Sequence, residues 1–320
     1  MSWPQNYLTG TAPEAHGLAT LGWVALIVFS IVTAIVWVLL VWSLNRRRGT
    51  LSEHALITLD DGRSWVTLGG YAIPVVILAV IFALTLHTLR AYPMVHELTP
   101  GAGALIRVTG HQWWFDAEYL GNRPDLNVVA PTEIHVPTGC AVDLELQTRD
   151  VIHSFWVPKL NGKVDLVPDQ VNHIRLRVDK PGLYEGECGE YCGMQHAHMR
   201  LQVMAQSPDE FQAWLAAQRA PAVAATQATT AYGAQVFQTA ACPLCHTVRG
   251  TSAHGQIGPD LTHVGSRLRI AGGMLDNTAA NLATWIAHAQ SLKPGSLMPD
   301  LPQINAEDLS ALVAYLRALQ

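Results

Sequence analysis

The sequence predicts a multi-domain membrane protein: a hairpin of two membrane-spanning helices, then an all-β domain, then an all-α domain. Two observations predict the membrane part. Only 14% of the 320 residues are charged, against roughly 25% in ordinary soluble domains. The missing charges are concentrated in residues 17–45 and 64–89, which contain no Asp, Glu, Lys or Arg. A net charge of −5 without a basic stripe also excludes a nucleic-acid-binding protein.

The two apolar runs, at about residues 18–44 and 68–89, are each long enough to cross a bilayer, which takes roughly 20 helical residues. A signal peptide would begin with basic residues and have a shorter apolar core, whereas no Lys or Arg precedes the first run. Buried core helices are the other reading of such runs. We predict two membrane helices within residues 1–99.

The loop between the two runs predicts their orientation. It carries four arginines, Arg46, Arg47, Arg48 and Arg63. Positively charged loops face the cytoplasm, so both termini and both later domains are predicted on the outer side. This arrangement fits a multi-pass protein of the bacterial inner (plasma) membrane whose C-terminal domains lie in the periplasm.

Residues 100–205 alternate between apolar and polar side chains in short runs, which is typical of β-strands. Turn residues such as Pro137-Thr138-Gly139 and Pro181-Gly182 separate these runs. Short strands with regular turns predict a sandwich or a barrel. Residues 206–230 are interpreted as a short helix and a linker rich in Ala, Pro and Thr. Residues 231–320 follow a helical pattern and form a separate domain.

The segment Cys242-Pro243-Leu244-Cys245-His246 has the C-x-x-C-H spacing of a c-type haem attachment site. The two thiols add to the porphyrin vinyl groups, and the adjacent imidazole binds the iron. Met298 is the best candidate for the sixth ligand, because prolines and a glycine hold its loop open. The competing candidates are Met274, His254, His263 and His288. Ligation by histidine and methionine raises the reduction potential of a haem.

A second group of candidate ligands comprises Cys188, Cys192, His196 and Met199, preceded by His153. Thiolate, imidazole and thioether ligands select copper or zinc over magnesium or calcium. A zinc site would use four ligands and leave the methionine unexplained. Two bridging thiolates, two histidines and one methionine provide instead for two copper ions. Cys140 has no such neighbours and is predicted to be a buried apolar thiol.

At these residues the chain resembles subunit II of the haem–copper cytochrome c oxidases. The segments that carry the resemblance are Asp150-Val151-Ile152-His153-Ser154-Phe155-Trp156-Val157-Pro158 and the loop of residues 188–199. The resemblance implies a dinuclear copper A centre in a cupredoxin-like β-sandwich, with two bridging cysteines. The implied ligands are Cys188, Cys192, His153, His196, Met199 and the backbone carbonyl of Glu190. The side chain of Glu190 is implied to bind a Mg or Mn ion at the interface with subunit I.

Two further segments resemble known families. Residues 231–320 resemble a class I cytochrome c, in which Gly233 and Phe237 before the haem motif meet Tyr315 of the last helix. The aromatic segment that contains Trp113 resembles the one through which electrons enter subunit II from cytochrome c. The resemblance implies the same role for Trp113, unless the fused haem domain has moved that point.

The chain also departs from the oxidase family at two places. Many members carry a Glu just before the second span, where this chain has Thr67-Leu68-Gly69-Gly70. The route by which protons enter is therefore not predicted. Glu187 stands where a Gln often precedes the first copper cysteine.

The resemblance implies the electron-accepting subunit of a caa-type cytochrome c oxidase. Electrons would pass from an external donor, such as a cytochrome c or a quinol–cytochrome c reductase, to haem c, then to copper A. They would go on to haem in subunit I, where O2 is reduced and protons are pumped; subunit III is a further expected partner. A quinol oxidase subunit would lack the copper ligands. A subunit of a copper-A-bearing nitric oxide reductase and a copper-delivery protein are the alternatives.

Overall fold

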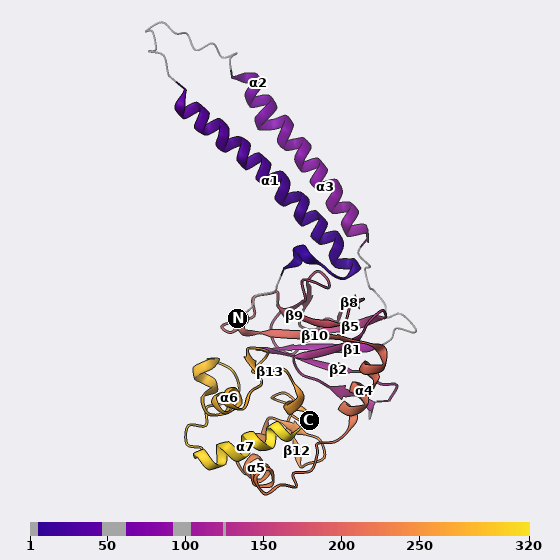
Figure 1. Cartoon of the computed structure of the whole chain (residues 1–320), viewed down its shortest axis with the longest axis vertical. Helices are drawn as coiled ribbons and strands as arrows, with labels where there is room; N and C mark the ends of the chain where they lie inside the picture. Colours follow the sequence, from indigo (N-terminus) through magenta and orange to yellow (C-terminus); the bar gives the residue numbers. More distant parts are fainter. Residues whose placement is uncertain (1–5, 47–61, 92–103, 124–125) are drawn as a thin grey trace.

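The computed structural model describes residues 6–46, 62–91, 104–123 and 126–320. A helical hairpin, a β-sandwich and a helical domain follow one another along the molecule, with the sandwich in the middle (Figure 1). The predicted fold class is confirmed.

The hairpin consists of α1 (Pro13–Asn45) and a second long helix made of three parts. These parts are α2 (Arg63–Trp65), the π-helical η2 (Val66–Ala72) and α3 (Ile73–Ala91). Both helices are long and apolar enough to cross a membrane, and their apolar side chains are mostly exposed. A helix that is apolar on every face is stable only in lipid or against other apolar helices. Of the four loop arginines, Arg47 and Arg48 lie outside the described residues.

The N-terminal segment attaches the hairpin to the sandwich. It begins with η1 (Tyr7–Thr9), which Asn6 caps. The backbone N–H of Thr11 donates to the carbonyl of Lys159 at 2.9 Å. Ala12 and Ala15 are buried in the same apolar cluster as the sandwich core. Small side chains at the start of α1 therefore let the helix rest directly on the β-domain.

Two five-stranded sheets form the sandwich, in the orders β3-β2-β1-β5-β8 and β4-β10-β9-β6-β7. The strands of the first sheet are β1 (Leu105–His111), β2 (Trp114–Tyr119), β3 (Val128–Val129), β5 (Ala141–Thr148) and β8 (Asn172–Arg177). Those of the second are β4 (Glu133–Pro137), β6 (His153–Trp156), β7 (Val164–Leu166), β9 (Gly182–Cys188) and β10 (Arg200–Gln206). The pairs β1–β5 and β4–β10 are parallel, and the other described pairs are antiparallel.

Alternate side chains of both sheets point inward and form one core. Phe115, Leu144, Phe155 and Leu166 are among its fully buried members. The prediction that Cys140 is buried is wrong, because its side chain is exposed. Cys140 lies in the turn before β5, so the alternation that suggested burial begins only after it.

The helix α4 (Pro208–Arg219) packs against β3, β4 and β10. Ser207 and Glu210 form a capping box at its N-terminus, in which each side chain accepts from the other residue's backbone N–H. Such caps satisfy N–H groups that have no partner inside the helix. Trp214 stacks on His135 with ring centroids 3.9 Å apart, which fixes the helix on the sheet.

Residues 220–227 lead from α4 into the last domain and lie along its surface. The backbone N–H of Ala222 donates to the carbonyl of Arg249 at 2.9 Å, and His263 Nε2 lies 3.1 Å from the carbonyl oxygen of Ala220. The next helix, α5, begins at Ala228, inside the segment that the sequence predicts to be linker. The connection is therefore attached to the domain that follows it.

The last domain is built on α5 (Ala228–Thr239), α6 (Ala279–Leu292) and α7 (Ala306–Ala318). The helices α5 and α7 cross at Gly233, where a Cβ atom would lie 2.0 Å from the carbonyl oxygen of Ala311. The rings of Phe237 and Tyr315 meet beside this crossing at 5.8 Å. The shorter elements are η5 (Cys242–Leu244), β11 (Thr247–Val248), β12 (Ala253–His254), η6 (Val264–Ser266), β13 (Arg269–Ile270) and β14 (Leu275–Asp276).

Candidate functional site

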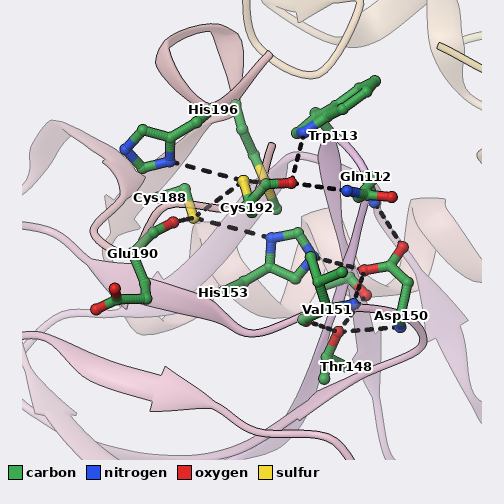
Figure 2. Close-up of polar contacts among 12 residues, drawn as sticks. Gln112, Trp113, Thr148, Asp150, Val151, His153, Cys188, Glu190, Cys192 and His196 are labelled. Atoms are coloured by element: carbon green, nitrogen blue, oxygen red, sulfur yellow. Dashed lines mark hydrogen bonds and ion pairs between the residues drawn. The ribbon is translucent and has the colours of Figure 1, made fainter. Parts of the chain in front are cut away.

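The candidate copper ligands converge at one end of the sandwich. Cys188 ends β9, Cys192 lies in the loop that follows, and His153 begins β6, which pairs with β9. The loop continues through η4 (His196–His198) to Met199. Figure 2 shows the two cysteines between the rings of His153 and His196. The sheet thus brings His153 to a loop that begins 35 residues further along the chain.

The distances between the donor atoms are short. The sulfurs of Cys188 and Cys192 are 3.8 Å apart, and Cys188 Sγ is 3.8 Å from His153 Nδ1. Cys192 Sγ is 3.6 Å from His196 Nδ1 and 3.8 Å from Met199 Sδ. Both rings therefore turn a nitrogen toward a sulfur. Two thiols, two imidazoles and a thioether that gather in this way fit soft or borderline metal ions such as copper.

The surroundings of Cys188 favour the thiolate form of this side chain. A hydrogen bond with the Cys192 thiol and one with the His153 ring outweigh burial and lower the pKa of Cys188 well below its ordinary value. The thiolate is the form of cysteine that binds metal.

Asp150 orients His153 from outside the ligand set. One carboxylate oxygen lies 2.7 Å from His153 Nε2, and the other accepts the backbone N–H of Gln112 at 2.7 Å (Figure 2). Partial burial raises the pKa of Asp150, but these hydrogen bonds outweigh it and leave the pKa below its ordinary value. A carboxylate on the far nitrogen of a ligating histidine fixes the ring and its tautomer. Sequence reasoning missed this role, although the spacing of three residues in one loop could have indicated it.

Glu190 contributes its two oxygen groups in different directions. Its backbone carbonyl lies 3.1 Å from Cys188 Sγ, beside the candidate copper ligands. Its carboxylate points away, is 41% exposed and pairs with Lys163 Nζ at 2.8 Å. The same ammonium is 3.2 Å from Asp165. An ammonium group thus occupies the position between these two carboxylates.

The candidate haem residues line one cavity at the boundary of the last domain and the sandwich. Cys242, Cys245, His246 and Met298 all line it. Among the described residues, the alternative iron ligands Met274, His254, His263 and His288 are not part of that lining. The structure therefore favours Met298 as the partner of His246.

The ring of His246 is held for ligation by the backbone. Its Nδ1 lies 2.8 Å from the carbonyl oxygen of Pro259, so Nε2 is the nitrogen available to a group in the cavity that His246 lines. A Cβ atom on Gly258 would approach this ring to 2.6 Å, so only glycine allows the loop so close. Burial lowers the pKa of His246, which favours the neutral ring that binds iron. Cavity lining, two thiols and an oriented imidazole fit a covalently attached haem.

The loop of Met298 has a support that sequence reasoning missed. The side-chain amide of Gln290 on α6 donates to the carbonyl of Met298 at 2.6 Å and to that of Ser296 at 2.7 Å. The amide oxygen accepts the backbone N–H of Gly295 at 3.0 Å. One side chain thus fixes the loop that presents the methionine.

Trp113 lies between the two sets of ligands. Its indole Nε1 donates to the carbonyl of Cys192 at 3.0 Å (Figure 2). Its ring also lines the haem cavity. The neighbouring Gln112 donates to the same carbonyl at 2.7 Å. Trp113 is only 8% exposed. The residue that resemblance marks as the point where electrons enter thus faces the chain's own haem cavity.

Two known families match the chain in successive stretches. The family described as "Cytochrome C oxidase subunit II, periplasmic domain" matches residues 123–206, and the family "Cytochrome c" matches residues 230–320. The boundary between the two matches falls at α4 and the segment after it.

Curated relatives extend this likeness over most of the chain. Cytochrome c oxidase subunit 2 of Alkalihalophilus pseudofirmus is 34% identical over 313 residues, covering 96% of this chain and 89% of that protein. The protein of the same name from Bacillus subtilis is 28% identical and covers 86% of this chain and 80% of that protein. Among solved structures, the periplasmic domain of subunit II of cytochrome oxidase of Bradyrhizobium japonicum is 25% identical. It covers 38% of this chain and 97% of that chain, with a TM-score of 0.35.

Proposed function

This chain belongs to the cytochrome c oxidase subunit 2 family, and on that premise we propose that it receives electrons at haem c and passes them through dinuclear copper A to haem in subunit I. The subunit I partner would use these electrons to reduce O2 and to pump protons. The external donor would be a cytochrome c or a quinol–cytochrome c reductase. The two apolar helices would span a bacterial inner membrane beside subunit I and, in a complete oxidase, subunit III.

The observation that carries this proposal is the position of Trp113. It donates to the backbone of Cys192, a candidate copper ligand, at 3.0 Å. A Cβ atom on Gly295, three residues before Met298, would lie 3.4 Å from the Trp113 ring. Electron transfer slows steeply with distance, so a ring that is hydrogen-bonded to one ligand loop and lies next to the other supports transfer between them. We infer that Trp113 conducts electrons from the chain's own haem rather than from a separate protein.

The side chains of each centre prepare it for electron transfer. Copper held by Cys188, Cys192 and their neighbours would supply one redox centre, and haem held by Cys242, Cys245 and His246 would supply a second. His153 and His246 are each fixed by a hydrogen bond on the nitrogen that does not face the metal site. Cys188, Cys192 and Met199 are buried, which excludes water from the copper ligands. A rigid, dry ligand set changes little in geometry when an electron arrives.

A Mg or Mn ion at Glu190 is a further part of this proposal. The carboxylates of Glu190 and Asp165 already share a cation, the ammonium of Lys163, which supports a negative potential there. A bound divalent ion would replace that ammonium. Metal analysis of the purified oxidase should find the ion in the unsubstituted protein and lose it in Glu190→Gln; an unchanged content would exclude this site.

The first test of the proposal is spectroscopic. The full chain in detergent, matured with haem and copper, should contain two copper ions per haem. It should show a low-spin c-type haem spectrum and the seven-line EPR pattern of a mixed-valence copper pair, since both ligand sets are intact. One copper per haem with an ordinary single-copper spectrum would exclude the dinuclear centre.

The second test follows the electron. Flash photoreduction of the haem should be followed by reduction of copper in the same chain. Trp113→Phe removes the hydrogen bond to Cys192 and should slow this step. Trp114→Phe is the matched control, because Trp114 also lines the cavity but stacks on His111 instead. If Trp113→Phe transfers electrons from haem to copper as fast as Trp114→Phe, Trp113 is not the conducting residue. If the unsubstituted chain shows no transfer, the proposed electron path is wrong.

A further inference from the structure

Lys293 is a buried cation that neither set of ligands explains. It caps the C-terminus of α6 and is only 2% exposed, whereas lysine is almost never fully buried unless it is paired. Its Nζ donates to three backbone carbonyl oxygens, those of Trp113 at 2.7 Å, Ala271 at 2.8 Å and His198 at 3.1 Å. In the ammonium form of Lys293, three N–H donors thus have three acceptors.

These three acceptors come from both domains. Trp113 and His198 belong to the sandwich, and both are next to the candidate copper site: Trp113 contacts Cys192, and His198 directly precedes Met199. Ala271 belongs to the last domain, between β13 and β14. One ammonium therefore ties the haem domain to the two segments that frame the copper ligands.

The tip between β13 and β14 fits closely into the sandwich. Gly272 has a φ of +70°, and a Cβ atom there would lie 2.4 Å from the carbonyl oxygen of Trp113 and 2.6 Å from Lys293 Nζ. The backbone N–H of Arg200 donates to the carbonyl of Gly272 at 2.9 Å. A side chain at Gly272 would have to separate the two domains.

The two residues that follow the lysine also touch the sandwich. Gln195 donates from its side-chain amide to the carbonyl of Pro294 at 2.9 Å. A Cβ atom on Gly295 would lie 3.4 Å from the ring of Trp113. The segment that leads to Met298 is thus held at three successive residues, and the position of the haem loop is coupled to that of the copper loop.

Burying the ammonium group of Lys293 costs free energy. Burial lowers the pKa of Lys293 to about 7, which shows that the surroundings disfavour its ammonium form. The directional hydrogen bonds of a buried polar group can specify one arrangement even where they add little to stability. Three carbonyl acceptors from two domains are an arrangement of that kind.

We propose that Lys293 is a positioning residue: together with the tip Ala271-Gly272-Gly273, it latches the haem domain onto the copper domain with Trp113 between the two centres. This inference rests on the proposed function, because the latch matters only if electrons pass from haem to copper within the chain. A latched domain keeps one fixed distance between haem and copper, and electron transfer then has one fast rate. A domain that is merely tethered visits this position only part of the time.

The test uses the full chain in detergent, loaded with haem and copper. Lys293→Met keeps a long unbranched side chain but removes all three donors. Transfer from photoreduced haem to copper should become slower by roughly tenfold or more, a factor that corresponds to about 1.4 kcal/mol of docking free energy. Pulsed EPR between the oxidised haem and the copper pair should change from a narrow to a broad distribution of distances. The haem absorption spectrum and the copper EPR pattern should be unchanged.

Lys180→Met is the matched control, because it removes the same charge from an exposed position of the sandwich. Its transfer rate should equal that of the unsubstituted chain. Transfer in Lys293→Met at the unsubstituted rate, with a narrow distance distribution, would overturn the latch and leave the proposed electron path intact. An unsubstituted chain without any transfer would instead show that the proposed function is wrong.

Lys293 also lines the haem cavity, so its replacement could affect the haem domain itself. If Lys293→Met loses its haem or the iron–methionine absorption band, the variant Gly272→Val tests the latch instead. Its added side chain points at the carbonyl of Trp113 and is expected to slow transfer by a similar factor. A Gly272→Val chain with a normal haem spectrum and an unsubstituted transfer rate would overturn the proposal.

Discussion

Residues that bind no metal orient the side chains of both centres. The carboxylate of Asp150 lies on the far nitrogen of His153, and the carbonyl of Pro259 lies on that of His246. Partners of this kind fix the tautomer and direction of a ligating histidine, and their loss commonly weakens metal binding by about 10- to 100-fold. Both sites are therefore arranged by groups that contact the ligating side chains and not the metals themselves.

A first prediction at this scale concerns the sixth iron ligand. Met298→Ala should keep the haem covalently attached, because Cys242, Cys245 and His246 are unchanged. It should open the sixth position, lower the reduction potential and abolish the weak iron–sulfur absorption band at the red end of the visible spectrum. Met274→Ala is the matched control and should keep the band. The choice of Met298 is wrong if the band survives Met298→Ala and is lost in Met274→Ala.

At the scale of elements, the haem domain depends on the crossing of α5 and α7. Gly233 lets the two helices approach until there is no room for a side chain between them. The rings of Phe237 and Tyr315 fill the space beside the crossing, and Tyr315 is 3% exposed. The helix before the haem motif is thereby fixed on the last helix of the chain.

Because of this crossing, replacing Gly233 by alanine should change stability in the opposite direction to the one that helix propensity predicts. In an exposed helix, Gly→Ala stabilises by about 1 kcal/mol. Gly233→Ala should instead lower the free energy of unfolding of the haem domain by about 1–3 kcal/mol, the usual cost of overpacking. Denaturant titration followed by haem absorption measures the change. Gln235→Ala, on an exposed face of the same helix, should change it by less than about 0.5 kcal/mol. Increased stability of Gly233→Ala would contradict the observed crossing.

At the scale of the whole molecule, the net charges of the two outer domains do not indicate how these domains fit together. Residues 100–205 carry 13 acidic and 9 basic residues, a net charge of −4, whereas residues 227–320 carry five of each. These totals predict no strong charge steering between the domains. The structure nevertheless pairs Arg269 with Glu185 across the boundary at 3.3 Å and lets the carboxylate of Glu133 accept the backbone N–H of Leu268. The complementarity is local and belongs to the docked arrangement.

Docking predicts how haem-to-copper transfer responds to solution conditions. The rate within one chain should be independent of protein concentration, because donor and acceptor are covalently joined. It should depend only weakly on salt, because the buried contacts of Lys293 are poorly screened. Flash photoreduction across a range of dilution and ionic strength measures both. Reduction of the haem by an external donor should be concentration-dependent, which provides the internal comparison. A haem-to-copper rate that falls in proportion to dilution would show that the haem does not serve its own copper site.

Sequence alone could predict whatever depends on neighbours along the chain. The two spans follow from runs without charge, and the haem attachment segment follows from Cys242, Cys245 and His246 in one pentapeptide. Four of the five candidate side-chain ligands of copper lie within residues 188–199, so spacing brings them together in any loop. The alternation of residues 100–205 predicted strands, although it misplaced Cys140, because a turn interrupts the strand there.

Only the tertiary structure decided what depends on residues distant in sequence. Pairing of β6 with β9 brings His153 to the copper loop, and the fold of the last domain places Met298 rather than Met274 in the cavity wall. The role of Lys293 has no local pattern at all, since its three acceptors lie 180, 95 and 22 residues away. The ligands of each candidate site lie mostly within short segments of the sequence. The distance between the two sites depends instead on how the two domains pack against each other. Short segments of the sequence therefore predict which groups the chain binds, and the fold determined that Trp113 lies between the two sets of candidate ligands.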